Sequence, residues 1–147
     1  MEAGDESRAS AVAVRAFEAS VAAHYSELGA EQFLRYAAPE ELRARSDRNH
    51  RVILAESDGV IEGMVEVRSA KHIAMLFVEP ARQRNGVGRA LVELAVELCR
   101  ERRSRLGAVT VNSSPNAVGA YLSFGFVVAG SERQRDGIIY TPMKLLL

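Results

Sequence analysis

The chain has 147 residues, the length of one ordinary domain, and 48% of them are hydrophobic and 26% charged, as in most globular proteins. Nineteen basic residues balance nineteen acidic ones, and this zero net charge argues against a dedicated nucleic-acid-binding protein. The acidic start lacks the regions of a secretory signal, and no run approaches the ~18 apolar residues of a membrane-spanning helix. We therefore expect one cytoplasmic domain over residues 1–147, with residues 1–10 disordered, that binds neither nucleic acid nor membranes.

The first 48 residues are predicted to be helical. Apolar residues recur at helical spacing from Ala11 to about Ala23, and the segment AEQFLRYA follows after a break. A third helix is expected to begin at Pro39, because acidic residues come directly after it and the helix dipole favours them in the first turn.

The pattern then changes to that of β-strands. RVILAE and VIEGMVEV are separated by Ser57-Asp58-Gly59, a sequence typical of a hairpin turn. HIAMLFVEP follows and stops at Pro80. These runs predict a three-stranded antiparallel meander.

The strongest predicted helix runs from Gly86 to Arg103, with one apolar stripe and one charged face. The next strand, GAVTVNSS, should lie parallel to the strand before the helix, as in a βαβ unit. A short helix that opens at Ser114-Pro115 and a final hairpin that turns at Asp136-Gly137 complete the chain. This order predicts an α/β fold with a mixed sheet.

The stretch QRNGVG, Gln83 to Gly88, joins a strand to the N-terminus of the long helix. Its glycines permit unusual dihedral angles and close approach, and the free amides and dipole of a helix start attract anions. A P-loop would need Gly-Lys-Ser/Thr after the last glycine, and a dinucleotide-binding loop would need Gly or Ala in place of Leu91. The residues themselves therefore predict a site for an anionic ligand and leave the identity of that ligand open.

Two motifs resemble those of the GCN5-related N-acetyltransferase (GNAT) superfamily. Gln83-x-x-Gly86-x-Gly88 is similar to the family's acetyl-CoA signature, and NAVGAYLSFGF, from Asn116 to Phe126, is similar to its later motif. The resemblance implies a mixed, mostly antiparallel sheet that is splayed between the family's fourth and fifth strands and flanked by helices. No pattern for the family's first edge strand is visible, so that strand is either absent or lies before the start of the given sequence.

The resemblance also implies acetyl-CoA as the cosubstrate. By motif matching, the backbone of Phe77 and Val78 would pair with the pantetheine arm, and Asn116 would face the other side of the cofactor. The pyrophosphate would be held by the backbone amides of Arg84, Asn85, Gly86, Val87, Gly88, Arg89 and Ala90.

The implied reaction is transfer of the acetyl group from acetyl-CoA to a primary amine of a small molecule or peptide, by direct attack in a ternary complex. Tyr121 matches the family's tyrosine that protonates the departing thiolate, although a core aromatic is the alternative. His72 is the candidate base, because imidazole abstracts protons near neutral pH, and Glu66 on the adjacent strand is its rival. The Val78 amide is the candidate oxyanion donor.

The alternative function is a non-catalytic module that binds or senses acyl-CoA. His24 and Tyr25 fall where the family builds its acceptor pocket, and Tyr140 and Met143 suggest a lined pocket, but none of these residues identifies the acceptor. Because Cys99 is the only cysteine, neither an intramolecular disulfide nor a thiolate metal cluster can form within one chain, and we predict no metal site. A homodimer is the oligomeric state that the resemblance suggests.

Overall fold

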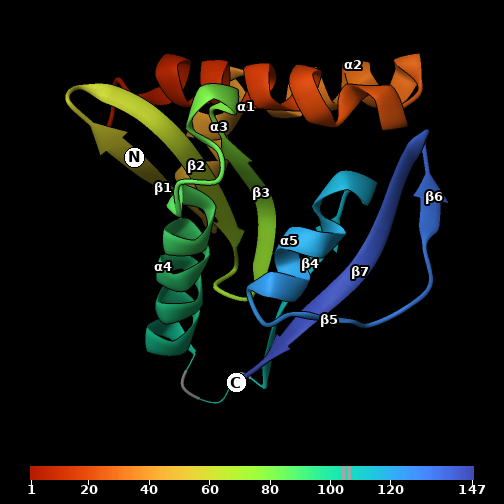
Figure 1. Cartoon of the computed structure of the whole chain (residues 1–147). Coiled ribbons are helices and arrows are strands. Elements are labelled where there is room, and N and C mark those ends of the chain that lie inside the picture. The colour runs from red at the N-terminus through yellow and green to blue at the C-terminus, as the bar shows by residue number, and fades with distance from the viewer. Residues whose placement is uncertain (104, 106) are drawn as a thin grey trace.

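The computed structural model describes residues 1–103, 105 and 107–147 (Figure 1). The helices are α1 (Glu6–Ser20), α2 (Glu27–Tyr36), α3 (Pro39–Ser46), α4 (Val87–Arg102) and α5 (Val118–Ser123), with short 3₁₀ turns η1 (Ala22–His24), η2 (Pro80–Arg82) and η3 (Pro115–Ala117). The strands are β1 (His50–Ser57), β2 (Val60–Arg68), β3 (His72–Val78), β4 (Ala108–Ser113), β5 (Val127–Val128), β6 (Arg133–Arg135) and β7 (Ile138–Leu146).

The strands form one mixed sheet in the order β1-β2-β3-β4-β7-β5, and β6 pairs with β7. Among the strand pairs of the described residues, β3–β4 alone is parallel, because α4 crosses over between these two strands. The turn between β1 and β2 has positive φ at Asp58 and Gly59, as the predicted hairpin requires. The predicted meander, the βαβ unit and the mostly antiparallel sheet are thus confirmed.

Helices cover the two faces of the sheet and bury two separate clusters. Val65 and Leu76 pack with Leu91 and other residues of α4, whereas Met64 and Phe77 pack against α1 and α3. Neighbouring residues join different clusters because successive side chains of a strand point to opposite faces. Both layers are therefore fixed to the central strands β2 and β3.

The sheet opens between β3 and β4, as Figure 1 shows. These strands pair only at His72 with Thr110 and at Ile73 with Val111. Beyond that point β3 continues beside β2 to Val78, while β4 stays with β7. An irregularity in the β2–β3 register skips Ala74, and such a bulge bends a strand away from its neighbour. The predicted splay is confirmed, with β3 and β4 as the family's fourth and fifth strands.

The expectation that residues 1–10 are disordered is wrong. Helix α1 already begins at Glu6, and Ala9 on its inner face is fully buried. The Asp5 carboxylate accepts hydrogen bonds from the Glu2 amide and from Arg8, and the Met1 ammonium donates to the Val52 carbonyl of β1 at 2.8 Å. The contacts of Met1 and Asp5 therefore order the chain at the start of the helix. No strand precedes α1 in the described residues.

The β6–β7 hairpin reaches across to the start of α2 (Figure 1). Its turn has positive φ at Asp136 and Gly137, and the Gly137 carbonyl accepts a hydrogen bond from the Ser26 amide at 3.0 Å. A Cβ atom added at Gly29 would lie 2.9 Å from that carbonyl oxygen. The hairpin thus docks against α2 through two glycines that leave no room for a side chain.

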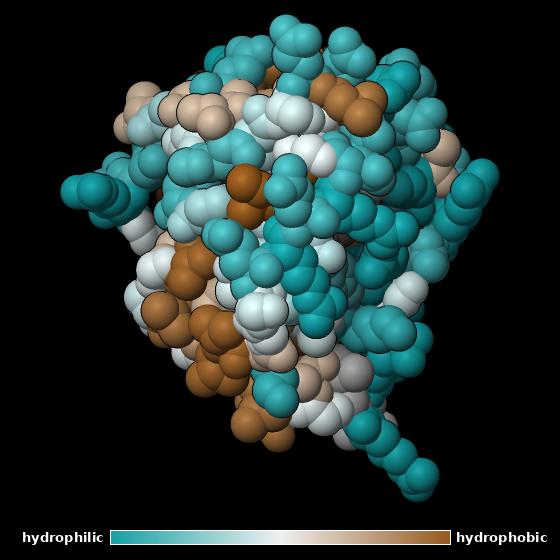
Figure 2. Space-filling view, turned by 90° about the vertical axis from the view of Figure 1, so that its right-hand side faces the viewer, coloured by the Kyte–Doolittle hydropathy of each residue, from teal (hydrophilic) through white to brown (hydrophobic). Residues whose placement is uncertain are grey.

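On the face that carries this hairpin, hydrophilic side chains predominate on the right and hydrophobic side chains gather at the lower left (Figure 2). Large exposed apolar side chains of the C-terminal half include Leu122, Val127, Val128 and Leu146. Among the described residues, no helix is both long and apolar enough to span a membrane.

Candidate functional site

A cavity of about 550 Å³ occupies the opening between β3 and β4. Its walls are the diverging strand ends, from Ile73 to Val78 on β3 and from Val111 to Ser114 at the end of β4. The loop from Gln83 to Gly88, which we call the glycine loop, lies at one end of the cavity. The segments η3 and α5 form another side. We call this cavity the groove. Its volume is typical of a site for a small molecule or cofactor.

The backbone of β3 offers hydrogen-bonding groups to the groove at alternate residues. The Glu79 amide donates to the Glu62 carbonyl on β2, so Phe77, two residues earlier, also directs its backbone groups toward β2. The backbone N–H and C=O groups of Val78 and Leu76 therefore face the opening. The prediction that the Val78 backbone faces the cofactor agrees with this geometry. The same prediction for the Phe77 backbone is wrong. The bulge near Ala74 shifts by one residue which backbone groups of β3 face β2 and which face the opening. Phe77 lines the groove with its side chain instead.

The glycine loop presents free amides at the N-terminus of α4. Among the described residues, the backbone amides of residues 83–89 have no hydrogen-bond partner. The Ala90 amide, in contrast, donates to the Gly86 carbonyl as the first bond of the helix, so the prediction that Ala90 binds the pyrophosphate is wrong. Gly86 caps the helix with φ of 82°, a value that favours glycine.

Side chains around the loop support its shape. The side-chain amide of Gln83 donates a hydrogen bond to the Val78 carbonyl at 3.2 Å, and this bond ties the loop to the end of β3. The Arg89 guanidinium donates to the Ser123 carbonyl at 3.2 Å and lies over the Phe124 ring. Arg89 therefore connects α4 to α5 beside the groove, and Asn116 lines the groove from η3.

Tyr121 lies in the wall of the groove on α5 and is only 5% exposed. Its ring packs edge-on against Phe124 and Phe126. Burial raises the pKa of its phenol, so the group stays protonated at neutral pH. Tyr121 thus packs in the core and keeps its phenolic proton at neutral pH.

His72 lies at the closed end of the splay, outside the groove lining. Its Nδ1 atom is 2.8 Å from the Thr110 hydroxyl. Burial, followed by the charges of Arg68, Lys71 and His50, lowers the pKa of His72 to about 4. The imidazole is therefore neutral at pH 7 but only weakly basic.

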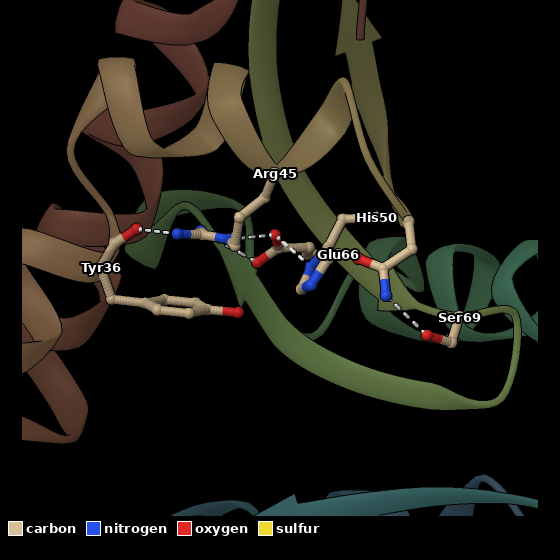
Figure 3. Close-up of polar contacts among 6 residues, drawn as sticks. Tyr36, Arg45, His50, Glu66 and Ser69 are labelled. Carbon is tan, nitrogen blue, oxygen red and sulfur yellow. Dashed lines mark hydrogen bonds and ion pairs between the residues drawn. The ribbon is translucent and has the colours of Figure 1, made fainter.

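Glu66 lies in neither cavity wall and is fully buried (Figure 3). Its Oε1 atom accepts a hydrogen bond from Arg45 at 2.7 Å and lies 2.8 Å from His50 Nδ1. Arg45 also donates to the Tyr36 carbonyl, and its guanidinium carbon is 3.5 Å from the centre of the Tyr36 ring. The carboxylate that sequence reasoning offered as a base is thus the centre of a buried polar cluster that holds Tyr36.

Tyr36 was not predicted as a site residue, yet it lines the groove and a second cavity of about 310 Å³. Burial and the Glu66 charge raise the pKa of Tyr36 to about 12. We call the second cavity the side cavity. It shares six lining residues with the groove, Tyr25, Tyr36, Ile73, Ala74, Asn112 and Ser114, so the two adjoin.

Tyr25 and Tyr140, two of the residues that the sequence suggested for an acceptor pocket, line the side cavity, whereas His24 and Met143 line neither cavity. The side cavity also contains His72 and three charged side chains that sequence reasoning missed: Arg68, Arg135 and Asp136. No local motif marks these three residues, because they come from separate strands and a turn that only the fold brings together.

Comparisons with known proteins give a consistent family. Residues 21–147 match the model of the acetyltransferase (GNAT) domain. A GCN5-related N-acetyltransferase from Rhodopseudomonas palustris is 25% identical with a TM-score of 0.85, over 100% of this chain and 92% of that chain. The PaiA N-acetyltransferase from Thermoplasma acidophilum, solved with coenzyme A, is 19% identical with a TM-score of 0.79, over 100% and 96%. The ribosomal-protein-S18-alanine N-acetyltransferase from Escherichia coli is 18% identical with a TM-score of 0.69, over 99% and 90%.

These findings agree with the predicted cosubstrate, acetyl-CoA, and with the splayed sheet that the two sequence motifs implied. With the family match covering all but the first 20 residues, this chain belongs to the GNAT family of acetyltransferases.

Proposed function

We propose that this protein transfers the acetyl group of acetyl-CoA to a primary amine of a small molecule or peptide by direct attack in a ternary complex. The observation that carries this proposal is the continuous arrangement of free amides, groove and adjoining side cavity. The amides of Arg84 to Arg89 bind the pyrophosphate, where the helix dipole adds favourable charge. The pantetheine arm then runs along Leu76 and Val78, with Asn116 on its other side.

The chemistry divides between three groups. The acceptor nitrogen attacks the thioester carbonyl carbon, and the Val78 amide stabilises the oxyanion that forms. When the carbon–sulfur bond breaks, its electron pair goes to sulfur and the Tyr121 hydroxyl gives this thiolate a proton.

Neutralising an amine of ordinary pKa at pH 7 requires about 4–5 kcal/mol, so the site must assist loss of the amine proton. His72 remains the proposed proton acceptor, because it lines the side cavity in its neutral form. The positive charges that lower its pKa act on a bound ammonium in the same direction, which favours the neutral nucleophile. Glu66 is removed from this role, since it is ion-paired and lines neither cavity.

The test is release of free coenzyme A from acetyl-CoA across a panel of amines, with Tyr121→Phe as the variant. Loss of the acid should lower kcat by about 100-fold or more while coenzyme A affinity is retained. Leu122→Ala is the matched control, because Leu122 is the next residue of α5 and is half exposed. Unchanged kcat in Tyr121→Phe would remove its assigned role.

A non-catalytic acyl-CoA module is the competing function. It predicts coenzyme A binding by calorimetry without turnover of any amine. The predicted homodimer and the cytoplasmic location remain predictions that sedimentation and cell fractionation would test.

A further inference from the structure

The side cavity adjoins the part of the groove where β3 and β4 separate, so an acceptor seated in it would face the thioester. Its walls come from five parts of the chain: the end of β2, the start of β3, the end of β4, the β6–β7 hairpin, and α2 with the residue Tyr25 before it. The docking of the Gly137 turn on α2 fixes the hairpin wall relative to the others. The charges that these walls carry therefore have defined positions around one small space.

Positive charge prevails in the side cavity. Arg68 from β2 and Arg135 from β6 both line it, and Asp136 is the carboxylate among its described lining residues. His72 adds no charge at pH 7. The cavity therefore has one formal positive charge in excess.

Neither arginine is neutralised by a partner in the part of the chain that the structure describes, whereas Arg15 and Arg45 are paired with Glu79 and Glu66. Both arginines are exposed, and surface arginines are usually solvated, but these two come from different strands and line the same cavity. The guanidinium group offers a planar fork of donors that fits a carboxylate or phosphate.

We propose that Arg68 and Arg135 bind a carboxylate or phosphate group of the acceptor, so that the substrate is an amine that also carries an anion. The inference rests on the proposed function and narrows it to a substrate class. The aromatic walls formed by Tyr25, Tyr36 and Tyr140 leave room for an apolar part beside the anion. Polyamines, which bring only positive charge, are poor acceptors on this proposal.

The test compares kcat/KM for matched amines: phenylalanine with phenylalaninamide, phosphoethanolamine with ethanolamine, and spermidine. Phenylalaninamide has the less basic amine, so intrinsic reactivity favours it, and a preference for phenylalanine must come from binding. In at least one pair, we expect kcat/KM of the amine that carries an anionic group to exceed that of its partner without this group by at least about 10-fold. The pair that shows this difference identifies the anion as carboxylate or phosphate.

Arg68→Gln and Arg135→Gln should each remove most of this preference while leaving coenzyme A affinity unchanged. Arg133→Gln is the charge-matched control, because Arg133 lies on the same strand as Arg135 but lines neither cavity. The proposal would be overturned if kcat/KM for spermidine equalled or exceeded that for the amines that carry an anionic group. It would also be overturned if the preference for those amines survived both arginine substitutions.

Calorimetric titration of the same amines in the presence of coenzyme A separates this inference from the proposed function. Arginine-dependent binding of the anionic amines without any turnover would support the anion site and refute the acetyltransferase activity. Turnover of the amines without an anionic group, with no added affinity for their partners that carry one, would support the acetyltransferase activity and refute the anion site.

Discussion

Glu66→Gln tests whether the buried carboxylate is structural or catalytic. The change keeps the shape of the side chain but removes the charge that faces Arg45 at 2.7 Å and His50 at 2.8 Å. Removing one partner of a buried ion pair typically destabilises a protein by 3–5 kcal/mol. The Arg45 side chain is 13% exposed and glutamine still accepts one hydrogen bond, so we expect a loss near the lower limit, about 3 kcal/mol.

For a domain of this size, a loss of that magnitude should lower Tm by roughly 6–12 °C, as measured by circular dichroism. The matched control is Glu62→Gln on the same strand, whose carboxylate lies 3.7 Å from Arg82 in a peripheral pair, and its effect should stay within about 1 kcal/mol.

Activity is measured well below the transition, where Glu66→Gln remains folded. Its kcat should then stay within about 10-fold of the parent, because the carboxylate lines neither cavity. An unchanged Tm together with a fall in kcat of about 100-fold or more would show that Glu66 is the base and refute this reasoning.

Three further predictions follow from the glycine positions and from His72. Gly86→Asp should abolish coenzyme A binding in calorimetry, because it strains a residue with φ of 82° and repels the pyrophosphate; Gly119→Ala, at ordinary φ on α5, should bind normally. Gly29→Ala should displace the Gly137 turn and raise KM for the acceptor but not for acetyl-CoA, so a parallel rise in both would contradict the docking role. The lowered His72 pKa favours the neutral side chain in the folded state, so its contribution to stability is present above pH 6.5 and is lost as the pH falls toward 4. His72→Asn should therefore lose less stability than the parent protein between pH 7 and pH 4.5 in urea unfolding, and equal losses would refute the assignment.

Much of the fold and the cofactor side of the site was predictable, because its signals are local. Asp58-Gly59 specifies a hairpin, the apolar stripe specifies α4, and Gln83 to Gly88 is one contiguous loop whose dihedral requirements are written in its glycines. The helical start shows the limit of such reasoning, since disorder was expected where hydrogen bonds of Met1 and Asp5 order the chain.

The side cavity and the buried cluster around Glu66 depended on contacts between distant segments. Arg45 and Glu66 are 21 residues apart, and no spacing rule pairs them. A single bulge near Ala74 decides that Val78 rather than Phe77 turns its backbone to the groove. Arg68 and Arg135 share a cavity only because the β6–β7 hairpin docks on α2. The sequence by itself thus determined the elements and the glycine loop, whose causes lie within a few residues, whereas tertiary packing decided which charges meet around the side cavity.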